Sequence, residues 1–363
     1  MKVSYSPWSR AVWPFGRGAM VVWTESSRKG RLNKVGALNI PIEDATPKHE
    51  PVMVREILAD LRLKPGDVVF DGTLGLGGHS AAMLEQIEPG GTLVGTDWDE
   101  QMLEGAKARL LLVPTRTEIK LVKADFRDLP GLAAKWDLWP NAILLDLGLN
   151  SAQVDDSERG FSFRETGPLD MRMDRNEGEP ASAVLNRMTP AQIETMLKEL
   201  GDERWARAIA KQIVERRKSK PLKTTQDLVD CVLAAIPPGA REKRIHPATR
   251  TFQAVRIYVN GELDGLEWTI RELCELLKQG GTIAVLSYHS GEDRIVKQVF
   301  RQLSQSGFDE LHKKPVEATE TEIRKNPRAR SAKLRSLRRH ENGSKEGAKE
   351  NSRMKRHGSH TRT

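Results

Sequence analysis

The 363-residue sequence predicts an α/β fold in which helices cover a mainly parallel sheet and a long helical segment is inserted between two strands. Apolar runs of strand length alternate with amphipathic helical segments, an order that builds right-handed β-α-β units. The stretch between residues 147 and 281 has helical periodicity and no convincing strand. We therefore expect a sheet domain with a second, helical unit over the carboxyl edge of its strands.

Ordered structure is expected to begin near His49. A helix follows at once, because apolar side chains recur at i, i+3, i+4 and i+7 in Val54, Ile57, Leu58 and Leu61. Pro65 and Gly66 predict a turn into a first strand at 68–70.

Further strands are expected at 92–97, 119–125 and 142–146, with a helix at 101–112. Later in the chain, apolar residues at helical spacing predict an amphipathic helix from Leu263 to Leu277. Gly280 and Gly281 end that helix, and the run 282–289 returns the chain to the sheet.

These elements divide the chain into four parts. Residues 49–153 and 260–338 are expected to form the sheet domain, and residues 154–259 the inserted helical unit. Residues 1–48 lack a sustained period and are expected to be a disordered N-terminal extension. Residues 339–363 mix charges with Gly and Ser and are expected to be a disordered basic tail.

The formal net charge of +8 is concentrated at the two ends of the chain. Residues 1–48 hold eight Lys and Arg against three acids, and residues 324–363 hold fourteen against three. The middle of the chain is therefore net acidic. Basic ends suit an anionic partner such as nucleic acid, although solubilising disordered tails have the same composition.

Other features of the composition restrict the cellular setting. No run of about 18 apolar residues exists, so no membrane-spanning helix is expected, and the N-terminus lacks the unbroken apolar core of a signal peptide. Cys231 and Cys274 show no CxxC spacing, which fits a reducing compartment and predicts no metal site. We expect a cytoplasmic protein without a membrane partner.

The stretch DGTLGLGG, residues 71–78, follows the first strand and predicts a loop that turns tightly around a ligand. A phosphate-binding P-loop would need a Lys after the glycines, and none is present. A nicotinamide fingerprint needs GxGxxG; Gly75 and Gly77 fit it, but Ser80 stands in the third position. S-adenosylmethionine fits better, because Asp71 could receive its ammonium group while the glycine backbone lies beside its carboxylate.

Acidic residues also close the next three strands. Asp97 stands where a carboxylate can accept hydrogen bonds from ribose hydroxyls, whether of S-adenosylmethionine or of a nicotinamide cofactor. Asp125 could accept from an adenine amine, and Phe126 could cover the face of that ring. Asp146 closes the fourth strand. Capping of the following helices is the alternative role for these acids.

A basic stripe marks the inserted unit. Basic residues recur at i, i+3 and i+7 in Arg204, Arg207 and Lys211, opposite an apolar stripe of Trp205, Ile209 and Ile213. In the segment HPATRTFQAVR, polar residues recur at helical spacing in Arg250, Gln253 and Arg256. These side chains could contact phosphates or base edges of RNA, although a basic stripe is also the usual form of a solvated helix face.

Six longer motifs make the sequence similar to a known family. They are DGTLGLGGHS, LLDLGLNSAQVDDSERGFSF, GPLDMRMD, HPATRTFQAVRIYVNGEL, SYHSGEDRIVK and NPRARSAKLR. Together they resemble the bacterial RsmH (MraW) family of 16S ribosomal RNA cytidine N4-methyltransferases, from about His49 to about Arg339. The chain departs from the usual family residues at Asn150 and Ala152, where serine and proline are common, and at Tyr288 and Gly291, where Phe and Leu are common.

The resemblance implies a class I, Rossmann-like S-adenosylmethionine-dependent methyltransferase sheet with an inserted helical subdomain that holds the RNA. It implies that the substrate is 16S ribosomal RNA in the small ribosomal subunit, methylated at the exocyclic N4 amine of cytidine 1402 in the decoding centre. It leaves the oligomeric state open, and a dimer is compatible with it. The cofactor contacts that it implies are Gly77, Gly78, His79, Asp97, Phe126, Asp146 and Gln153, with Asp71 and Gly75 in the supporting loop.

Asp146 is the candidate catalytic residue. A carboxylate that accepts the N–H bonds of the cytosine amine would orient it and raise its nucleophilicity. A role in cofactor binding alone suits the same position equally well. Two other functions also stay open on the residues alone, a nicotinamide-dependent oxidoreductase and an RNA-binding ribosome assembly factor without catalysis.

Overall fold

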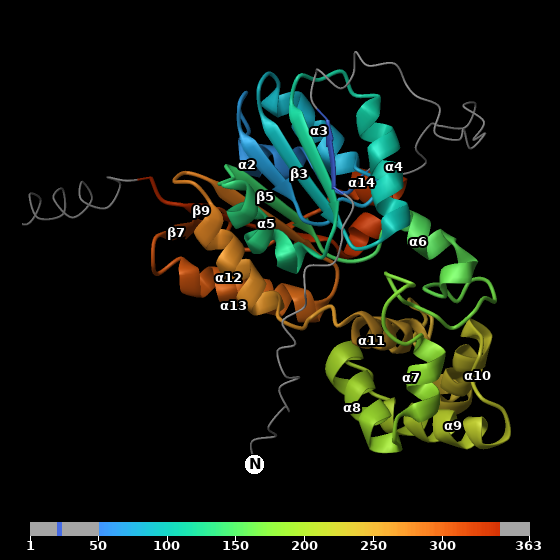
Figure 1. The fold of residues 1–363 in the computed structure, drawn as a ribbon. Helices are drawn as coiled ribbons and strands as arrows, with labels where there is room; N and C mark the ends of the chain where they lie inside the picture. The colour runs from blue at the N-terminus through green and yellow to red at the C-terminus, as the bar shows by residue number, and fades with distance from the viewer. Residues whose placement is uncertain (1–19, 24–50, 342–363) are drawn as a thin grey trace, which may run out of the picture.

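The computed structural model describes residues 20–23 and 51–341 (Figure 1). In these residues nine strands form one sheet in the order β1-β4-β3-β2-β5-β6-β9-β7, and β8 also pairs with β9. The sheet is parallel from β4 to β6 and antiparallel at both ends. The strands are β1 (Met20–Trp23), β2 (Val68–Asp71), β3 (Thr92–Asp97), β4 (Glu118–Lys123), β5 (Ala142–Asp146), β6 (Thr282–Ser287), β7 (Phe308–Glu310), β8 (Val316–Glu317) and β9 (Lys333–Arg339).

The order of the strands reverses at β2. From β2 the chain moves to β3 and β4 on one side, and later to β5 and β6 on the other side. In an open parallel sheet, such a reversal leaves a crevice outside the carboxyl ends of the central strands, because the two connections diverge there. The fold thus predicts its ligand site at the ends of β2 and β5.

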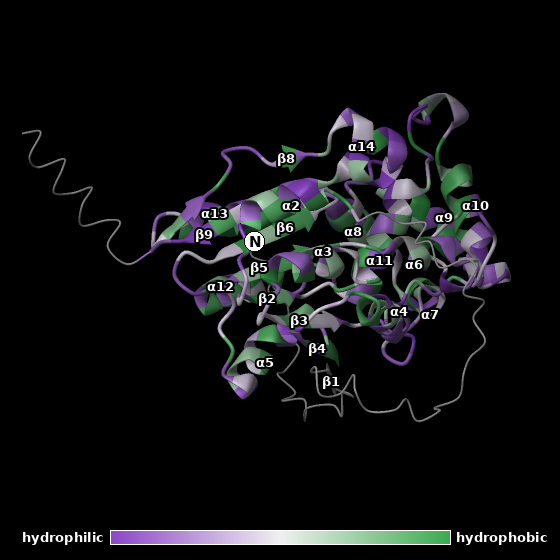
Figure 2. Ribbon diagram, turned by 90° about the horizontal axis from the view of Figure 1, so that it is seen from above, coloured by the Kyte–Doolittle hydropathy of each residue, from purple (hydrophilic) through white to green (hydrophobic). Residues whose placement is uncertain are grey.

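Helices cover both faces of the sheet (Figures 1 and 2). One face carries α2 (Val54–Leu61), α3 (Gly78–Ile87) and α4 (Glu100–Leu111), and the other carries α5 (Leu129–Trp136), α12 (Leu266–Leu276) and α13 (Ser290–Leu303). Neighbouring strand residues alternate between the two cores, as Val69 and Phe70 do. Burial on both faces explains why these strands read as unbroken apolar runs. No helix in the described part of the chain is both long and apolar enough to cross a membrane.

Most of the predicted strands are observed, and the differences in their bounds have local causes. The strands expected at 92–97 and 142–146 have those bounds. The run 119–125 ends early, at Lys123, because the side chain of Asp125 accepts a hydrogen bond from the backbone N–H of Arg127 (2.9 Å) and caps a 3-10 turn. The last run ends at Ser287, because the next residues turn into the N-terminus of α13.

The sequence pattern did not predict β7, β8 or β9. The strand β9 reads KLRSLRR, so charged residues interrupt its apolar pattern although it lies between β6 and β7. Arg335 donates to Asp293 (2.7 Å), and Arg338 donates to the carbonyl oxygen of Asp60 (2.8 Å). Long-range partners of this kind stabilise charged side chains inside a sheet and leave no trace in hydropathy.

Two expectations about the chain ends are wrong in part. Met20–Trp23 lies within the extension that was expected to be disordered, yet it forms β1 and pairs antiparallel with the edge strand β4. Arg339, which was assigned to the tail, is the last residue of β9. The remaining expectations of disorder fall on residues 1–19, 24–48 and 342–363, which lie outside the described residues.

The segment between β5 and β6 is helical, as its periodicity predicted. Its helices before α12 are α6 (Ser151–Asp155), α7 (Ala181–Arg187), α8 (Pro190–Gly201), α9 (Ala206–Ser219), α10 (Thr225–Ala235) and α11 (Thr249–Asn260). The one strand-like pairing described in this segment is an isolated bridge between Pro168 and Thr224. Helices α7 to α11 enclose a hydrophobic cluster of their own and lie beside the sheet domain in Figure 1. We call residues 154–259, which contain this cluster, the insertion.

Ile209→Ala should destabilise the insertion, because Ile209 is fully buried in its hydrophobic cluster. Truncation of the side chain leaves a cavity and should lower the free energy of unfolding by about 2–5 kcal/mol. Lys211→Ala, on the exposed face of the same helix, is the control and should change it by less than about 0.5 kcal/mol. Chemical denaturation measures both variants, and equal effects would contradict a packed core around Ile209.

Candidate active site

A pocket opens at the carboxyl ends of the central strands, where the sheet domain meets the insertion. It encloses about 870 Å³ of empty space, a volume that includes open solvent at its mouth. The strand ends contribute Gly72, Thr73, Gly75, Asp97, Asp125, Phe126 and Asp146. The insertion and its two junctions with the sheet contribute Asn150, Gln153, Met173, Asn260 and Glu262.

The glycine loop after β2 is held close to the sheet. The backbone N–H of Leu74 donates to the carbonyl oxygen of Thr96 (2.9 Å), and the N–H of Gly77 donates to that of Leu74 (2.8 Å). Gly75 and Gly77 have φ values of 52° and 73°. A Cβ atom on Gly75 would lie 2.7 Å from Nδ2 of Asn150. The left-handed backbone and this close approach favour glycine, and at Gly72 and Gly75 the loop presents bare backbone to the pocket.

Asp97 lies at the end of β3 with its carboxylate in the pocket wall. Oδ2 accepts a hydrogen bond from the N–H of Gly75 (2.7 Å), and Oδ1 accepts from the N–H of Asp99 (2.8 Å). Each oxygen keeps a lone pair for a ligand. Burial raises the pKa of Asp97 to about 7, against the lowering effect of these two hydrogen bonds. A ligand that donates hydrogen bonds to Asp97 would favour its ionised form.

Asp71 does not line the pocket, contrary to the role expected for it. Its residue is 1% exposed, and its carboxylate accepts hydrogen bonds from the hydroxyl of Ser80 (2.6 Å) and the N–H of Thr73 (3.2 Å). Asp71 therefore joins the end of β2 to the first turn of α3. The expectation that it receives the ammonium group of a ligand does not agree with this position.

Asp146 ends β5 and lies among polar side chains at the pocket floor. The hydroxyl of Tyr288 donates to Oδ1 (2.8 Å), and Nδ1 of His79 lies 3.7 Å from Oδ2. Nε2 of His79 donates to the carbonyl oxygen of Val52 (2.8 Å). Burial raises the pKa of Asp146, while His79 and the Tyr288 hydroxyl lower it. His79 thus stands behind Asp146 and does not line the pocket itself.

Asp125 and Phe126 lie at the pocket wall, as expected, but Asp125 already has partners within the protein. Its carboxylate accepts hydrogen bonds from the backbone N–H and the guanidinium of Arg127, each at 2.9 Å. Arg127 also donates to the carbonyl oxygen of Gly261 (2.7 Å). The end of β4 is therefore tied to the point where the chain returns from the insertion.

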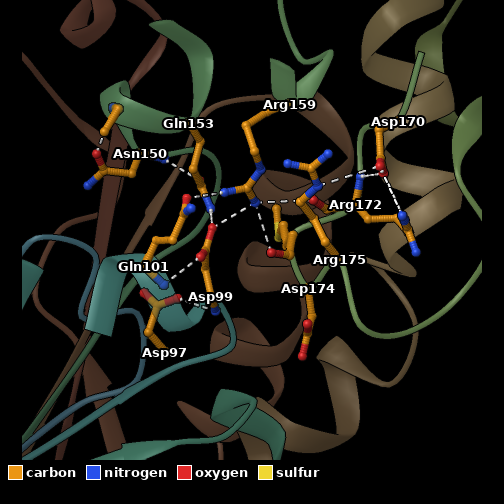
Figure 3. A network of polar contacts seen from close by, with 12 residues as sticks. Asp97, Asp99, Gln101, Asn150, Gln153, Arg159, Asp170, Arg172, Asp174 and Arg175 are labelled. Carbon is orange, nitrogen blue, oxygen red and sulfur yellow. Dashed lines mark hydrogen bonds and ion pairs between the residues drawn. The ribbon is translucent and has the colours of Figure 1, made fainter. Parts of the chain in front are cut away.

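Gln153 is placed by a buried polar network (Figure 3). Its Oε1 accepts from the N–H of Asn150 (3.0 Å), and its Nε2 donates to Oδ2 of Asp99 (2.8 Å). The same oxygen of Asp99 accepts from the guanidinium of Arg159 (2.7 Å). Asn150, at a position where this chain departs from the family pattern, caps α6 by accepting from the N–H of Ala152 (3.0 Å).

The wall formed by the returning chain was not predicted from the sequence. Asn260 ends α11, Glu262 follows it, and Glu292 lies in the first turn of α13; all three line the pocket. Glu262 accepts two hydrogen bonds from the guanidinium of Arg256 (2.7 and 2.6 Å). The motifs that hold these residues were recognised, but the fold alone brings them to the ends of β2 and β5.

Glu262, His289 and Glu292 bring three potential metal ligands together, with ligand atoms within 4.8 Å of one another. Arg256 already pairs with Glu262. Nδ1 of His289 accepts from the N–H of Glu292 (3.4 Å), which leaves a proton on Nε2, 3.1 Å from the Glu292 carboxylate.

The residues predicted to contact RNA differ in exposure: those on and just before α9 are exposed, and those on α11 are at least partly buried. Arg207 and Lys211 project from the exposed face of α9, and Arg204, just before this helix, is also exposed. Both Arg204 and Arg250 pair with Glu242 at 2.9 Å.

The other two predicted residues lie on α11. Gln253 is half-buried. The side chain of Arg256 is 16% exposed and is bound to Glu262 in the pocket wall. This geometry argues against an RNA contact for Arg256 and makes it a residue that positions Glu262.

The sheet order and the pocket together define the class of this protein. Five parallel strands with an antiparallel strand beyond β6 form the sheet of a class I, Rossmann-like S-adenosylmethionine-dependent methyltransferase. The pocket fits this cofactor, because it offers bare glycine backbone, an acceptor carboxylate at Asp97 and an aromatic ring at Phe126. The chain belongs to the MraW methylase family, whose sequence profile matches residues 46–340.

Relatives named ribosomal RNA small subunit methyltransferase H match most of this chain. The relative from Syntrophotalea carbinolica is 45% identical over 309 residues, which is 80% of this chain and 98% of the relative. Those from Halothermothrix orenii and Persephonella marina are 40% and 42% identical, over 79% and 80% of this chain and 97% and 99% of their own length. Family membership confirms the resemblance read from the motifs, the class I fold and S-adenosylmethionine as the cofactor.

The carboxyl of Asp97 should titrate near pH 7 in the ligand-free protein, against about 3.9 in an unfolded chain. Because the folded pKa is the higher one, its contribution to stability is present below about pH 4 and is lost as the pH rises through about 7. Carbon-13 NMR of aspartate-labelled protein measures the midpoint, and Asp97→Asn identifies the resonance. A midpoint near 4 would show that this carboxyl is not buried as described.

Proposed function

We propose that this methyltransferase acts on small-subunit ribosomal RNA and methylates the exocyclic N4 amine of a cytidine in 16S ribosomal RNA, cytidine 1402 of the decoding centre. The names of its relatives support the small-subunit substrate. The resemblance of the six motifs supports the N4 amine of a cytidine. One structural observation carries the proposal: the cofactor pocket shares its walls with an insertion that presents an exposed basic helix.

Residues on three strand ends would hold the cofactor. Asp97 would accept hydrogen bonds from the ribose hydroxyls, and Phe126 would cover the adenine ring. The backbone of Gly75 would lie beside the methionine part, with Gln153 closing the pocket. Gly77 and Gly78, the other two glycines that the resemblance implies as contacts, do not line the pocket and face α4 and Pro51. When bound, S-adenosylmethionine supplies a methyl group that its sulfonium already activates. The protein therefore has to bind the cofactor, orient the acceptor amine toward its methyl group and exclude water.

Asp146 would orient the acceptor amine. It lies in the pocket wall at the end of β5 and keeps lone pairs that Tyr288 does not use. An ionised carboxylate that accepts an N–H bond of the amine holds the nitrogen in place and raises its nucleophilicity. Burial raises the pKa of Asp146, and His79 and the Tyr288 hydroxyl oppose that rise and so favour the ionised form. Correct orientation of two reactants can supply about 7–11 kcal/mol of a reaction barrier.

The insertion would hold the RNA. The target cytidine has to leave any base stack before it enters a pocket of this depth. Arg207 and Lys211 on α9 are exposed cations suited to phosphate contacts. Such contacts fix the position of the strand but carry little sequence information, so the pocket itself has to recognise the base.

Two rival functions differ in what they would do with the pocket. A nicotinamide-dependent oxidoreductase would use the same glycine loop and Asp97, but membership of a methylase family argues against it. A ribosome assembly factor would bind the cofactor and the RNA without transferring a methyl group. Small ribosomal subunits that lack the modification are incubated with labelled S-adenosylmethionine. Mass spectrometry of the nucleosides then identifies the labelled base, and mass spectrometry of nuclease fragments gives its position, which separates these functions. We expect label in N4-methylcytidine at position 1402; label in another nucleoside would refute the N4 assignment, and no label would favour the assembly factor.

Asp97→Ala should weaken cofactor binding while the protein stays folded. Loss of a charged hydrogen-bond acceptor typically costs about 1.5–3 kcal/mol, which corresponds to about a 10- to 100-fold rise in Kd. Calorimetry measures the Kd, and Glu104→Ala, an exposed acid on α4, is the control and should leave it unchanged. An unaltered Kd in folded Asp97→Ala would remove Asp97 from the cofactor site.

Charge reversal of Arg207 and Lys211 should weaken binding of the small subunit and leave cofactor affinity unchanged, because both side chains lie outside the pocket. For each phosphate that is no longer neutralised, the slope of log K against log salt should fall in magnitude by about 1. Charge reversal of Lys313 and Lys314, two exposed residues in the loop between β7 and β8, is the matched control. An equal effect of the two double variants would refute a specific role for α9.

A further inference from the structure

Arg159 is a buried cation that the proposed chemistry does not use. Its residue is 2% exposed, and it does not line the pocket. Its guanidinium nevertheless bonds to one residue of the pocket wall, Met173, and to two side chains, Asp99 and Gln101, that are next to wall residues in the sequence (Figure 3). It donates to Oδ2 of Asp99 (2.7 Å), to Oε1 of Gln101 (3.2 Å) and to the carbonyl oxygen of Met173 (2.9 Å).

The backbone of Arg159 belongs to the insertion. Its carbonyl oxygen accepts from the N–H of Met171 (3.0 Å), and its guanidinium lies 5.6 Å from the ring centre of Phe161. Both Met171 and Phe161 are members of the hydrophobic cluster of the insertion. The head of the Arg159 side chain, in contrast, is bound at the end of β3 in the sheet domain. One side chain therefore spans the two units.

The pocket depends on this contact through short chains of hydrogen bonds. Oδ2 of Asp99 accepts a hydrogen bond from Arg159. Oδ1 of Asp99 caps α4 by accepting from the N–H of Gln101 (3.0 Å), and the backbone N–H of Asp99 donates to Asp97. The oxygen that receives Arg159 also receives Gln153. Asp97, Gln153 and Met173 all line the pocket. Arg159 is thus one or two hydrogen bonds away from three of its wall residues.

Electrostatics make Arg159 and Asp99 interdependent. Asp99 is 3% exposed, and a buried carboxylate without its cation is strongly unfavourable. The cation that Asp99 needs comes from the insertion, not from the sheet domain. Asp99 can therefore stay buried and paired in this turn only while the insertion is docked on the sheet.

We propose that Arg159 is a positioning residue that makes cofactor affinity depend on the docking of the insertion. The inference rests on the proposed function in one respect, the placement of S-adenosylmethionine in this pocket. RNA that holds the insertion in its docked position strengthens cofactor binding. By linkage, the cofactor strengthens RNA binding by the same factor.

The first test measures binding of S-adenosylhomocysteine by calorimetry, so that no turnover occurs. Arg159→Met should raise its Kd by about tenfold or more, although Arg159 touches no ligand. Arg159→Lys should recover only part of the lost affinity, because an ammonium group cannot replace the planar guanidinium with its several fixed donors. The double variant Arg159→Met, Asp99→Asn removes the unpaired buried charge and should fold while its Kd stays raised.

Arg216→Met is the matched control for a merely structural effect. Arg216 pairs with the buried Asp227 (2.6 Å) inside the insertion and does not line the pocket. Its loss should lower the melting temperature without changing the Kd. If folded Arg159→Met and the folded double variant both bind S-adenosylhomocysteine as the wild type does, the positioning role is refuted.

The second test measures the same Kd with and without saturating small ribosomal subunits. The wild type should bind S-adenosylhomocysteine more tightly in their presence, and Arg159→Met should lose this gain. Equal wild-type affinities in the two conditions would refute the coupling. Asp97→Ala separates this inference from the proposed function. If neither Asp97→Ala nor Arg159→Met changes the Kd for S-adenosylhomocysteine, the cofactor placement is wrong. If only Asp97→Ala raises the Kd, the placement stands and the role of Arg159 is refuted.

Discussion

One topological constraint governs this molecule: the insertion occupies the crossover between β5 and β6, so it leaves and re-enters the sheet at the pocket. The residues just before it, Asn150 and Gln153, and those just after it, Asn260 and Glu262, all line the pocket. Arginines tie both junctions to the strand ends, Arg159 at the entry and Arg127 at the return. The cofactor site and the unit proposed to hold the substrate therefore cannot be built independently of each other.

The four strand-end acids share one sequence signal but divide into two roles. Burial raises the pKa of Asp71, Asp97, Asp125 and Asp146 alike. Asp71 and Asp125 are satisfied mainly by partners that fix the chain, Ser80 and Arg127. Asp97 and Asp146 keep lone pairs on the pocket side. The difference lies in which donors each carboxylate meets after folding, and this determines whether an acid supports the loop or is available to a ligand.

Local patterns were sufficient to predict the five parallel strands β2 to β6, but not the antiparallel strands at the two ends of the sheet or the pocket wall formed by the returning chain. The runs 92–97 and 142–146 are strands because apolar β-branched and aliphatic residues fill both cores, and this information is contained in the runs themselves. The roles of Arg159, Glu262 and Glu292 depend on partners far away in the sequence. The strand β9 was missed for the same reason, since Asp293 and Asp60 make its charged residues acceptable. The resemblance to the family predicted more of the site than the periodicity did, because it matches these residues with those of related sequences and does not have to derive their contacts.

The acidic pocket and the exposed basic residues of the insertion suggest why the insertion lies beside the pocket. Five acidic residues line the pocket against one arginine, Arg127, so the pocket itself offers a phosphate little attraction. A neutral base, in contrast, can enter the pocket and donate an amine to an acidic wall. On the proposed function, the backbone must then be held by cations that lie outside the pocket yet are rigidly connected to it. Arg207 and Lys211 on α9 lie outside it, and the buried Arg159–Asp99 pair provides the connection. On this proposal, the residues that attract the phosphates and those that accept the base lie in different places, and the Arg159–Asp99 pair connects the two units that hold them.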